Sequence, residues 1–285
     1  MKKIGIIDVG GGYKDIFGTG VFDYLLDENI SVDYTIGVSA GSGNITCYIS
    51  KQKGRNIPFY TEYPKDKEYQ SFKNFLQNGS YLNFDYLCKI CYFENKQSPF
   101  DYKTFIENKT EFEIVASCLE TGLPTYFKKE DIKIDNFDVI KASCCIPFIN
   151  QPIKINNNLY FDGGITDPIP IDRLLNNGID YAIVILTRPI YEKRTNNYEK
   201  KLSIFLNQYP RLQLALKNRI DLYNKQLDYA KKLMEEDKVL IIAPDDVSDL
   251  KLLTVDKEKQ MALYYEGYKK GKGIKDFINR KFKEQ

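Results

Sequence analysis

The stretch 35–43, Thr-Ile-Gly-Val-Ser-Ala-Gly-Ser-Gly, constrains the fold of this chain more than any other. It places Ser39 between Gly37 and Gly41 in a G-x-S-x-G pattern, directly after the mostly apolar residues 32–36. This pattern is typical of a nucleophile elbow, in which a strand turns sharply into a helix and presents the serine hydroxyl. Glycine tolerates the backbone angles of such a turn. The alternative interpretation is an ordinary Gly/Ser turn.

The complete absence of histidine limits the chemistry available to Ser39. A Ser-His-Asp triad cannot form within the chain, so the base for Ser39 would be a carboxylate or a lysine. The six cysteines include a Cys88-x-x-Cys91 pair and the neighbours Cys144 and Cys145. Neither the second ligand pair of a zinc site nor a thioredoxin-like context is visible. We therefore expect reduced thiols, mostly buried, and no metal or cofactor.

The composition is that of a globular protein, with 43% hydrophobic and 28% charged residues. The net charge of +2, with both signs interspersed, gives no reason to expect a nucleic-acid partner. The first apolar run ends at Asp8, too early for a signal peptide, and no run approaches the length of a membrane span. We expect a cytoplasmic protein.

The segment before the elbow reads as strand, glycine loop and helix. Residues 3–8 form the predicted strand, Gly10-Gly11-Gly12 the loop, and a helix follows from Ile16 to about residues 28–29. With the strand at 32–36, a helical crossover between two strands favours parallel pairing.

The glycine loop has three interpretations. In a dinucleotide-binding turn, Asp15 would stand at the third glycine position and place a carboxylate beside the pyrophosphate. A plain tight connection is the second interpretation. The third is an oxyanion hole, because glycine N–H groups at a helix N-terminus are well placed to bind negative charge.

The remaining segments predict a single domain over residues 1–285. We interpret residues 51–110 as a helical insert or cap, and its aromatic residues, including Phe72 and Phe75 at helical spacing, as core or as an acyl-chain pocket. Residues 112–117 with 125–127, and 153–155 with 159–161, form predicted hairpins. Further strands are predicted at 181–186 and 238–243, a helix at 138–145, and a mostly helical C-terminal part over 196–285.

Asp162 is the candidate base for Ser39. A predicted strand delivers it, and Gly163 and Gly164 allow a sharp turn and a close backbone approach. Ordinary Asp-Gly turn chemistry is the alternative, and Asp167 is the main competing carboxylate.

The C-terminal helices carry Lys269, Lys270, Lys272 and Lys275. A solvated charged face is the first interpretation, and a transient contact with a membrane surface is the alternative.

Three blocks occur in one order: Gly10-Gly11-Gly12, then Gly37-Val38-Ser39-Ala40-Gly41, then Asp162-Gly163-Gly164. In this order they resemble the patatin-like phospholipase family, in particular its bacterial branch. The resemblance implies a three-layer α/β/α fold with a mainly parallel central sheet. It implies that Ser39 is the nucleophile, that Asp162 is the general base, and that N–H groups around Gly10–Gly12 bind the oxyanion. It also implies phospholipid, lysophospholipid or acylglycerol esters as substrates.

Two residues depart from the family pattern G-G-G-x-R-G. Lys14 replaces the arginine, which keeps the charge but loses the planar donor geometry. Asp15 replaces the last glycine, and its charge would oppose an oxyanion unless the side chain is turned away or paired with Lys14. Two alternatives to hydrolysis therefore stay open: a non-catalytic lipid-binding or scaffold protein with this fold, and an acyltransferase that uses the same dyad.

Overall fold

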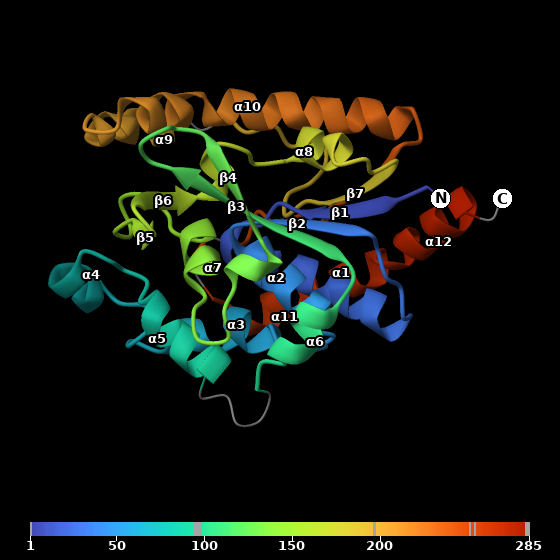
Figure 1. The fold of residues 1–285 in the computed structure, drawn as a ribbon, viewed down its shortest axis with the longest axis horizontal. Helices are drawn as coiled ribbons and strands as arrows, with labels where there is room; N and C mark the ends of the chain where they lie inside the picture. Colours follow the sequence, from blue (N-terminus) through green and yellow to red (C-terminus); the bar gives the residue numbers. More distant parts are fainter. Residues whose placement is uncertain (1, 94–98, 196–197, 251, 254, 283–285) are drawn as a thin grey trace.

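A mixed eight-stranded sheet forms the middle layer of the molecule (Figure 1). The computed structural model describes residues 2–93, 99–195, 198–250, 252–253 and 255–282. The strands are β1 (Ile4–Asp8), β2 (Tyr34–Val38), β3 (Glu111–Cys118), β4 (Pro124–Lys128), β5 (Ile153–Ile155), β6 (Asn158–Asp162), β7 (Tyr181–Ile185) and β8 (Val239–Ile242). The order β3-β2-β1-β7-β8 is parallel throughout, and β4, β6 and β5 add antiparallel pairings on the β3 side.

Helices cover both faces of this sheet. They are α1 (Ile16–Asp27), α2 (Ala40–Ile49), α3 (Ile57–Thr61), α4 (Phe72–Asn78), α5 (Phe84–Cys88), α6 (Tyr102–Glu107), α7 (Asp138–Ser143), α8 (Ile171–Asn176), α9 (Tyr198–Leu202), α10 (Pro210–Glu235), α11 (Lys257–Lys270) and α12 (Lys272–Phe282). Helices α8 and α10 cover one face, and α1, α2, α7 and α11 lie on the other (Figure 1). The three-layer α/β/α architecture with a mainly parallel sheet is confirmed.

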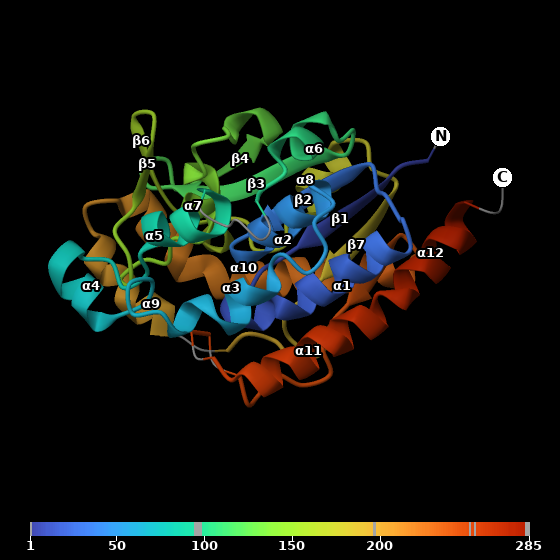
Figure 2. The same ribbon diagram turned by 90° about the horizontal axis from the view of Figure 1, so that it is seen from below.

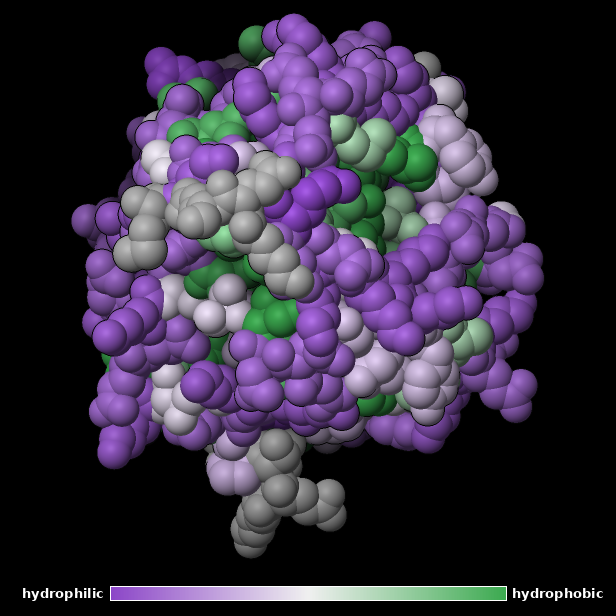
Figure 3. Space-filling view, turned by 90° about the vertical axis from the view of Figure 1, so that its right-hand side faces the viewer, coloured by the Kyte–Doolittle hydropathy of each residue, from purple (hydrophilic) through white to green (hydrophobic). Residues whose placement is uncertain are grey.

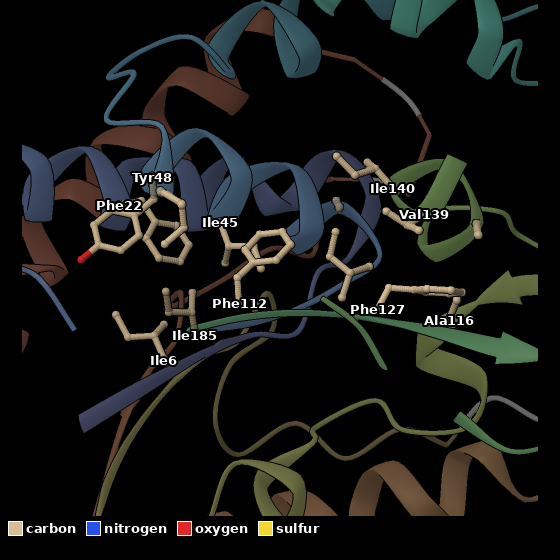
Figure 4. Close-up of a cluster of buried hydrophobic side chains, with 14 of the residues drawn as sticks. Ile6, Phe22, Ile45, Tyr48, Phe112, Ala116, Phe127, Val139, Ile140 and Ile185 are labelled. Atoms are coloured by element: carbon tan, nitrogen blue, oxygen red, sulfur yellow. The ribbon is translucent and has the colours of Figure 1, made fainter. Parts of the chain in front are cut away.

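The strands are buried on both faces because successive side chains point to opposite sides. Ile6 belongs to the apolar cluster beneath α1 and α2, whereas its neighbour Ile7 belongs to the cluster beneath α8 and α10. Figure 4 shows the first cluster, where Phe22 and Ile45 from the helices meet side chains of the sheet.

The predicted strand at 32–36 lies two residues later, at Tyr34–Val38. It therefore runs up to Ser39 without a break, as an elbow requires.

Residues 51–110 contain short helices and, in their described part, no strand of the sheet. The prediction that the aromatic residues of this segment are core or pocket is wrong for α4. Phe72 and Leu76 are 65% and 71% exposed, whereas Asn74 on the same helix is buried. The apolar side of this helix faces solvent.

A close crossing joins the C-terminal helix α11 to α1, which lie side by side in Figure 2. A Cβ atom on Gly20 would stand 2.0 Å from the carbonyl oxygen of Tyr264, and one on Gly267 would stand 2.1 Å from that of Phe17. Glycine on both helices permits this backbone contact. This contact joins residues 257–270 to the first helix of the chain. The sequence predicted only that these residues lie in a mostly helical region.

We expect Gly267→Ala to lower the free energy of unfolding by about 1–3 kcal/mol or more, because the new methyl group meets backbone that cannot move aside. Urea unfolding followed by circular dichroism measures this change. Gly273→Ala on α12 is the matched control, since its Cβ would meet only Ile242 at 3.7 Å. Equal stability of the two variants would contradict the tight crossing.

Candidate active site

Ser39 occupies the sharp turn between β2 and α2. Its φ of 53° and ψ of −130° lie in a region that residues other than glycine rarely adopt. The turn closes only because its neighbours are small: a Cβ on Gly37 would stand 2.7 Å from the Cα of Ser42, and one on Gly41 would stand 2.5 Å from the carbonyl oxygen of Asp8. The sharp turn from strand to helix that the sequence predicts at Ser39 is present.

The structure brings Asp162 to Ser39 from the end of β6. The Ser39 hydroxyl donates to Asp162 Oδ2 at 2.6 Å, and the Gly164 N–H donates to Asp162 Oδ1 at 2.8 Å. The backbone N–H of Asp162 donates to the Cys145 carbonyl at 2.8 Å. Gly163 is required at the turn, since a Cβ there would stand 2.2 Å from the Val115 carbonyl oxygen. Both oxygens of a buried carboxylate are thus held in place.

The competing carboxylate, Asp167, does not meet Ser39. It accepts hydrogen bonds from the hydroxyl of Tyr126 and from Gln226 Nε2. Burial raises the pKa of Asp167. Both partners belong to the structural framework around β4 and α10, which leaves Asp162 as the carboxylate within hydrogen-bond distance of the serine.

The glycine loop packs directly against the elbow. Gly10, Gly11 and Gly12 have φ values of 67°, 150° and 60°. A Cβ on Gly10 would lie 2.9 Å from Ser39 Cβ, so the loop and the serine are in contact. Within the described residues, the N–H groups of Gly11 and Gly12 form no hydrogen bond. They are therefore available to a ligand, just before the short 3₁₀ turn Gly12–Asp15 that leads into α1.

Lys14 and Asp15, the two departures from the family pattern, do not pair with each other. Lys14 Nζ donates to the Val247 carbonyl at 3.1 Å. Asp15 is fully buried beneath the loop, and its backbone carbonyl accepts from Asn44 Nδ2 at 2.9 Å. The same amide nitrogen donates to Asp8 Oδ2 at 3.0 Å. Asp15 is thus turned away from solvent and into the core.

Asp8 and Asp15 form a buried pair of acids. A Cβ on Gly18 would lie 2.6 Å from Asp8 Oδ2 and 2.7 Å from Asp15 Oδ1, which places the two carboxyl groups side by side. Burial raises the pKa of Asp8 to about 6, opposed by the hydrogen bond from Asn44. Burial, and then the charge of Asp8, raise the pKa of Asp15 well above its usual range. Both effects favour the neutral form of Asp15, which weakens the charge expected to oppose an oxyanion.

Three contacts of this region were not predicted from the sequence. Ser143, which with Ala142 is one of the smaller matches to the family pattern, accepts through Oγ from the backbone N–H of Ser39 at 2.9 Å, so that N–H is not free to bind an oxyanion. Thr187 Oγ1 donates to the Gly10 carbonyl at 2.5 Å. Arg219 Nε, on α10, donates to the Gly164 carbonyl at 2.6 Å. The partners in each contact are far apart in the chain, so no local pattern could have indicated the pairings.

An apolar pocket opens beside the elbow. Ala40 and Cys144, neighbours of Ser39 and Ser143, form its wall on that side. The insert supplies aromatic and aliphatic walls that include Phe59, Phe84 and Leu87. The cavity volume is about 40 Å³, which makes it a narrow slot. Among the described residues, no group of side chains suited to a metal ion is found.

The buried acid pair predicts a specific dependence of stability on pH. A raised pKa means that the folded state binds protons the unfolded chain releases, so stability falls as pH rises from about 4 through about 6 and beyond. Asp15→Asn removes one of the two carboxyl groups that bind these protons. We expect it to stabilise the protein by on the order of 1 kcal/mol at about pH 8, and to change little below about pH 4.

Urea unfolding of wild type and variant across this pH range measures the effect. Asp221→Asn, at an exposed position of α10, is the control. A stabilisation by Asp15→Asn that is the same at both ends of the range would contradict a shared buried proton.

Comparison with known proteins agrees with this architecture. The model of the patatin-like phospholipase family matches residues 9–175, and a domain of unknown function (DUF6363) matches residues 209–280. The uncharacterized protein YjjU of Escherichia coli is 27% identical over 209 residues, which cover 72% of this chain and 57% of YjjU. The lysophospholipase NTE1 of Meyerozyma guilliermondii is 25% identical over 72% of this chain, but only 14% of its own length.

Other matches are shorter or more remote. The probable lipid hydrolase 463L of Invertebrate iridescent virus 6 is 43% identical over 58 residues, which cover 20% of this chain and 19% of that protein. The crystal structure of VipD from Legionella pneumophila gives a TM-score of 0.49 at 14% identity, over 97% of this chain and 67% of that one. The chain thus spans little more than half of YjjU and far less of the other two curated relatives. Because the family model covers more than half of this chain, the protein belongs to the patatin-like phospholipase family.

Proposed function

We propose that this protein is a serine acyl hydrolase that cleaves carboxylic esters of lipids, with Ser39 as nucleophile and Asp162 as general base. The observation that carries the proposal is the 2.6 Å hydrogen bond from the Ser39 hydroxyl to Asp162 Oδ2, formed at a strained elbow. The family description and the names of two relatives, a lysophospholipase and a probable lipid hydrolase, favour lipid esters as the substrate class.

The first half-reaction forms an acyl-enzyme. Ser39 Oγ attacks the ester carbonyl carbon while its proton passes to Asp162 Oδ2, and the carbonyl π electrons move to oxygen. The free N–H groups of Gly11 and Gly12 stabilise that oxyanion. Collapse of the intermediate breaks the bond to the leaving oxygen, which takes the proton back from Asp162.

The second half-reaction frees the acid. Asp162 accepts a proton from a water molecule as the water attacks the acyl-serine carbonyl, and Ser39 then leaves with that proton. Because the Gly164 N–H binds Oδ1, Oδ2 stays directed at the reacting oxygen in both halves. An alcohol in place of water would give acyl transfer, and product analysis with an added acceptor alcohol separates the two reactions.

The apolar slot beside Ala40 suits the acyl chain of the substrate. Its walls come from α2, the insert and α7, and the lining residue Ala40 directly follows Ser39 in the chain. At about 40 Å³ the cavity is smaller than an ordinary ligand pocket, so a bound acyl chain would extend beyond it or widen it.

The proposed dyad predicts that substitution of Asp162 lowers esterase activity, whereas substitution of the nearby Asp167 does not. We expect Ser39→Ala to abolish hydrolysis of a p-nitrophenyl ester, and Asp162→Asn to lower kcat/KM by about 10²–10⁴-fold through loss of the base. Asp167→Asn is the matched control and should keep its activity, since Asp167 has no contact with Ser39. Activity retained by Asp162→Asn, or lost only in Asp167→Asn, would show that the base is misassigned.

Intact-mass measurement after treatment with a fluorophosphonate tests the nucleophile without a choice of substrate. We expect one adduct on the wild type and none on Ser39→Ala. A folded wild-type protein that forms no adduct and cleaves no ester would instead support the non-catalytic lipid-binding alternative.

Substitution of Gly43 tests the acyl slot. Gly43 lines the slot on α2, and a Cβ there would meet only the side chain of Asn56, at 3.5 Å. We expect Gly43→Leu to fill the slot and to raise KM for long-chain p-nitrophenyl esters more than for the acetate. Gly43→Ala should leave the chain-length profile close to that of the wild type. An unchanged profile in Gly43→Leu would place the acyl chain elsewhere.

A further inference from the structure

Helix α4 presents its apolar side to solvent. Phe72, Phe75 and Leu76 stand at positions i, i+3 and i+4 and form one stripe, in which the two rings stack at 6.0 Å. The stripe is exposed, and the inward residue of the helix is Asn74, whose side-chain amide binds backbone carbonyls of the preceding loop. A stripe of this kind packs against a core in most globular helices, so its exposure needs an explanation.

The 3₁₀ turn η6 (Ser203–Leu206), which follows α9, repeats this arrangement. Ser203 and Leu206 are buried, whereas Ile204 and Phe205 between them are 65% and 68% exposed. The ring of Phe205 lies 6.4 Å from that of Phe148, which anchors the turn to the segment after α7.

Both elements lie at the end of the molecule that holds the candidate active site. Ser39 and the glycine loop follow the carboxyl ends of β2 and β1, and Figures 1 and 2 both place α4 and α9 at that end. Gly79, at the end of α4, contacts Gln151, and the segment between Gln151 and α7 carries Phe148. The opposite end of the molecule, which faces the viewer in Figure 3, is mostly hydrophilic.

We propose that an apolar rim of five exposed side chains docks the protein on an anionic phospholipid bilayer. The apolar rim consists of Phe72, Phe75, Leu76, Ile204 and Phe205. Aromatic and aliphatic side chains on short amphipathic elements insert into the headgroup region of a bilayer. The proposal concerns attachment and does not depend on the chemistry of Ser39.

The charges beside the rim agree with an anionic surface. Segments 71–79 and 198–207 contain three lysines, Lys73, Lys200 and Lys201, and one acid, Glu199. The three lysines are exposed, and lysines near a bilayer add attraction to anionic lipids that salt weakens.

The C-terminal helices, the membrane-contact candidate of the sequence, suit this role less well. Lys270 pairs with Asp245 and Glu266, and Lys275 pairs with Glu28. Their apolar residues, such as Leu263 and Phe277, are packed inside. Within the described part of the chain, no helix has the length and apolar character of a membrane span.

The absence of tryptophan from the chain allows a direct probe of insertion. We expect the emission of Phe205→Trp to shift to the blue when vesicles of phosphatidylcholine with phosphatidylglycerol are added. Tyr265→Trp on α11 is the matched control, since Tyr265 is 64% exposed, and its emission should not move. A shift in neither variant, or an equal shift in both, would overturn the proposal.

Vesicle flotation of charged variants tests the same surface without a spectroscopic probe. We expect Ile204→Asp and Leu76→Asp each to lower the vesicle-bound fraction about tenfold or more, because an inserted side chain is replaced by a charge. Ile134→Asp, at a site 67% exposed on the β4–α7 connection, makes the same substitution as Ile204→Asp and should bind as the wild type does.

All flotation measurements use a Ser39→Ala background, so that hydrolysis of the vesicles cannot change the result and failure of the catalytic proposal leaves the test intact. Sedimentation of each protein without lipid identifies the competing occupant. A wild-type dimer that Ile204→Asp and Leu76→Asp dissociate, with no vesicle binding, would assign the rim to a second copy of the chain and overturn the proposal.

Discussion

The strained backbone of Ser39 is the constraint on which the rest of the site depends. A serine with positive φ persists only where its surroundings leave it no other conformation. Gly37 and Gly41 allow the turn to close, Gly10 brings the glycine loop against it, and Ser143 binds the N–H of Ser39. These contacts hold the serine hydroxyl at Asp162 before any substrate arrives. In the proposed dyad, this pre-organisation aligns the serine hydroxyl with a carboxylate base in a chain that has no histidine.

The C-terminal half supports the site from outside the region that the family model matches. Arg219 of α10 binds the turn after Asp162, and the Leu252 carbonyl accepts from the N–H of Tyr13 beside the glycine loop. Helix α11 in turn crosses α1 through Gly20 and Gly267. The turn after Asp162 thus contacts a residue 55 positions later in the chain, and the glycine loop and α1 contact residues more than 200 positions later. The region that DUF6363 matches, residues 209–280, therefore contains the residues that make these contacts.

Burial, rather than an ion pair, determines the charge of the two acids beneath the glycine loop, Asp8 and Asp15. Asp15 lies against Asp8, and Asn44 donates hydrogen bonds to the carboxylate of Asp8 and the backbone of Asp15. Because burial raises the pKa of both acids, their neutral forms are favoured and the negative charge beneath the loop is reduced. Lys14, in turn, joins the loop to the Val247 carbonyl. The two departures from the family pattern are therefore compatible with a glycine loop that binds an anion.

The features that depend on local chemistry could be predicted from the sequence. The sharp turn at Ser39, the glycine loop between a strand and a helix, the parallel pairing of the first two strands and the turn after Asp162 follow from glycine sterics and hydrophobic period, whereas the three-layer fold was implied by the family resemblance. Only contacts across the fold show that Asp162 rather than Asp167 meets Ser39, that Asp15 is buried, and that the stripe of α4 faces outward. Apolar residues at helical spacing indicate only that one side of the helix is apolar. Whether that side meets a core or solvent depends on contacts between residues far apart in the chain, which no local pattern encodes.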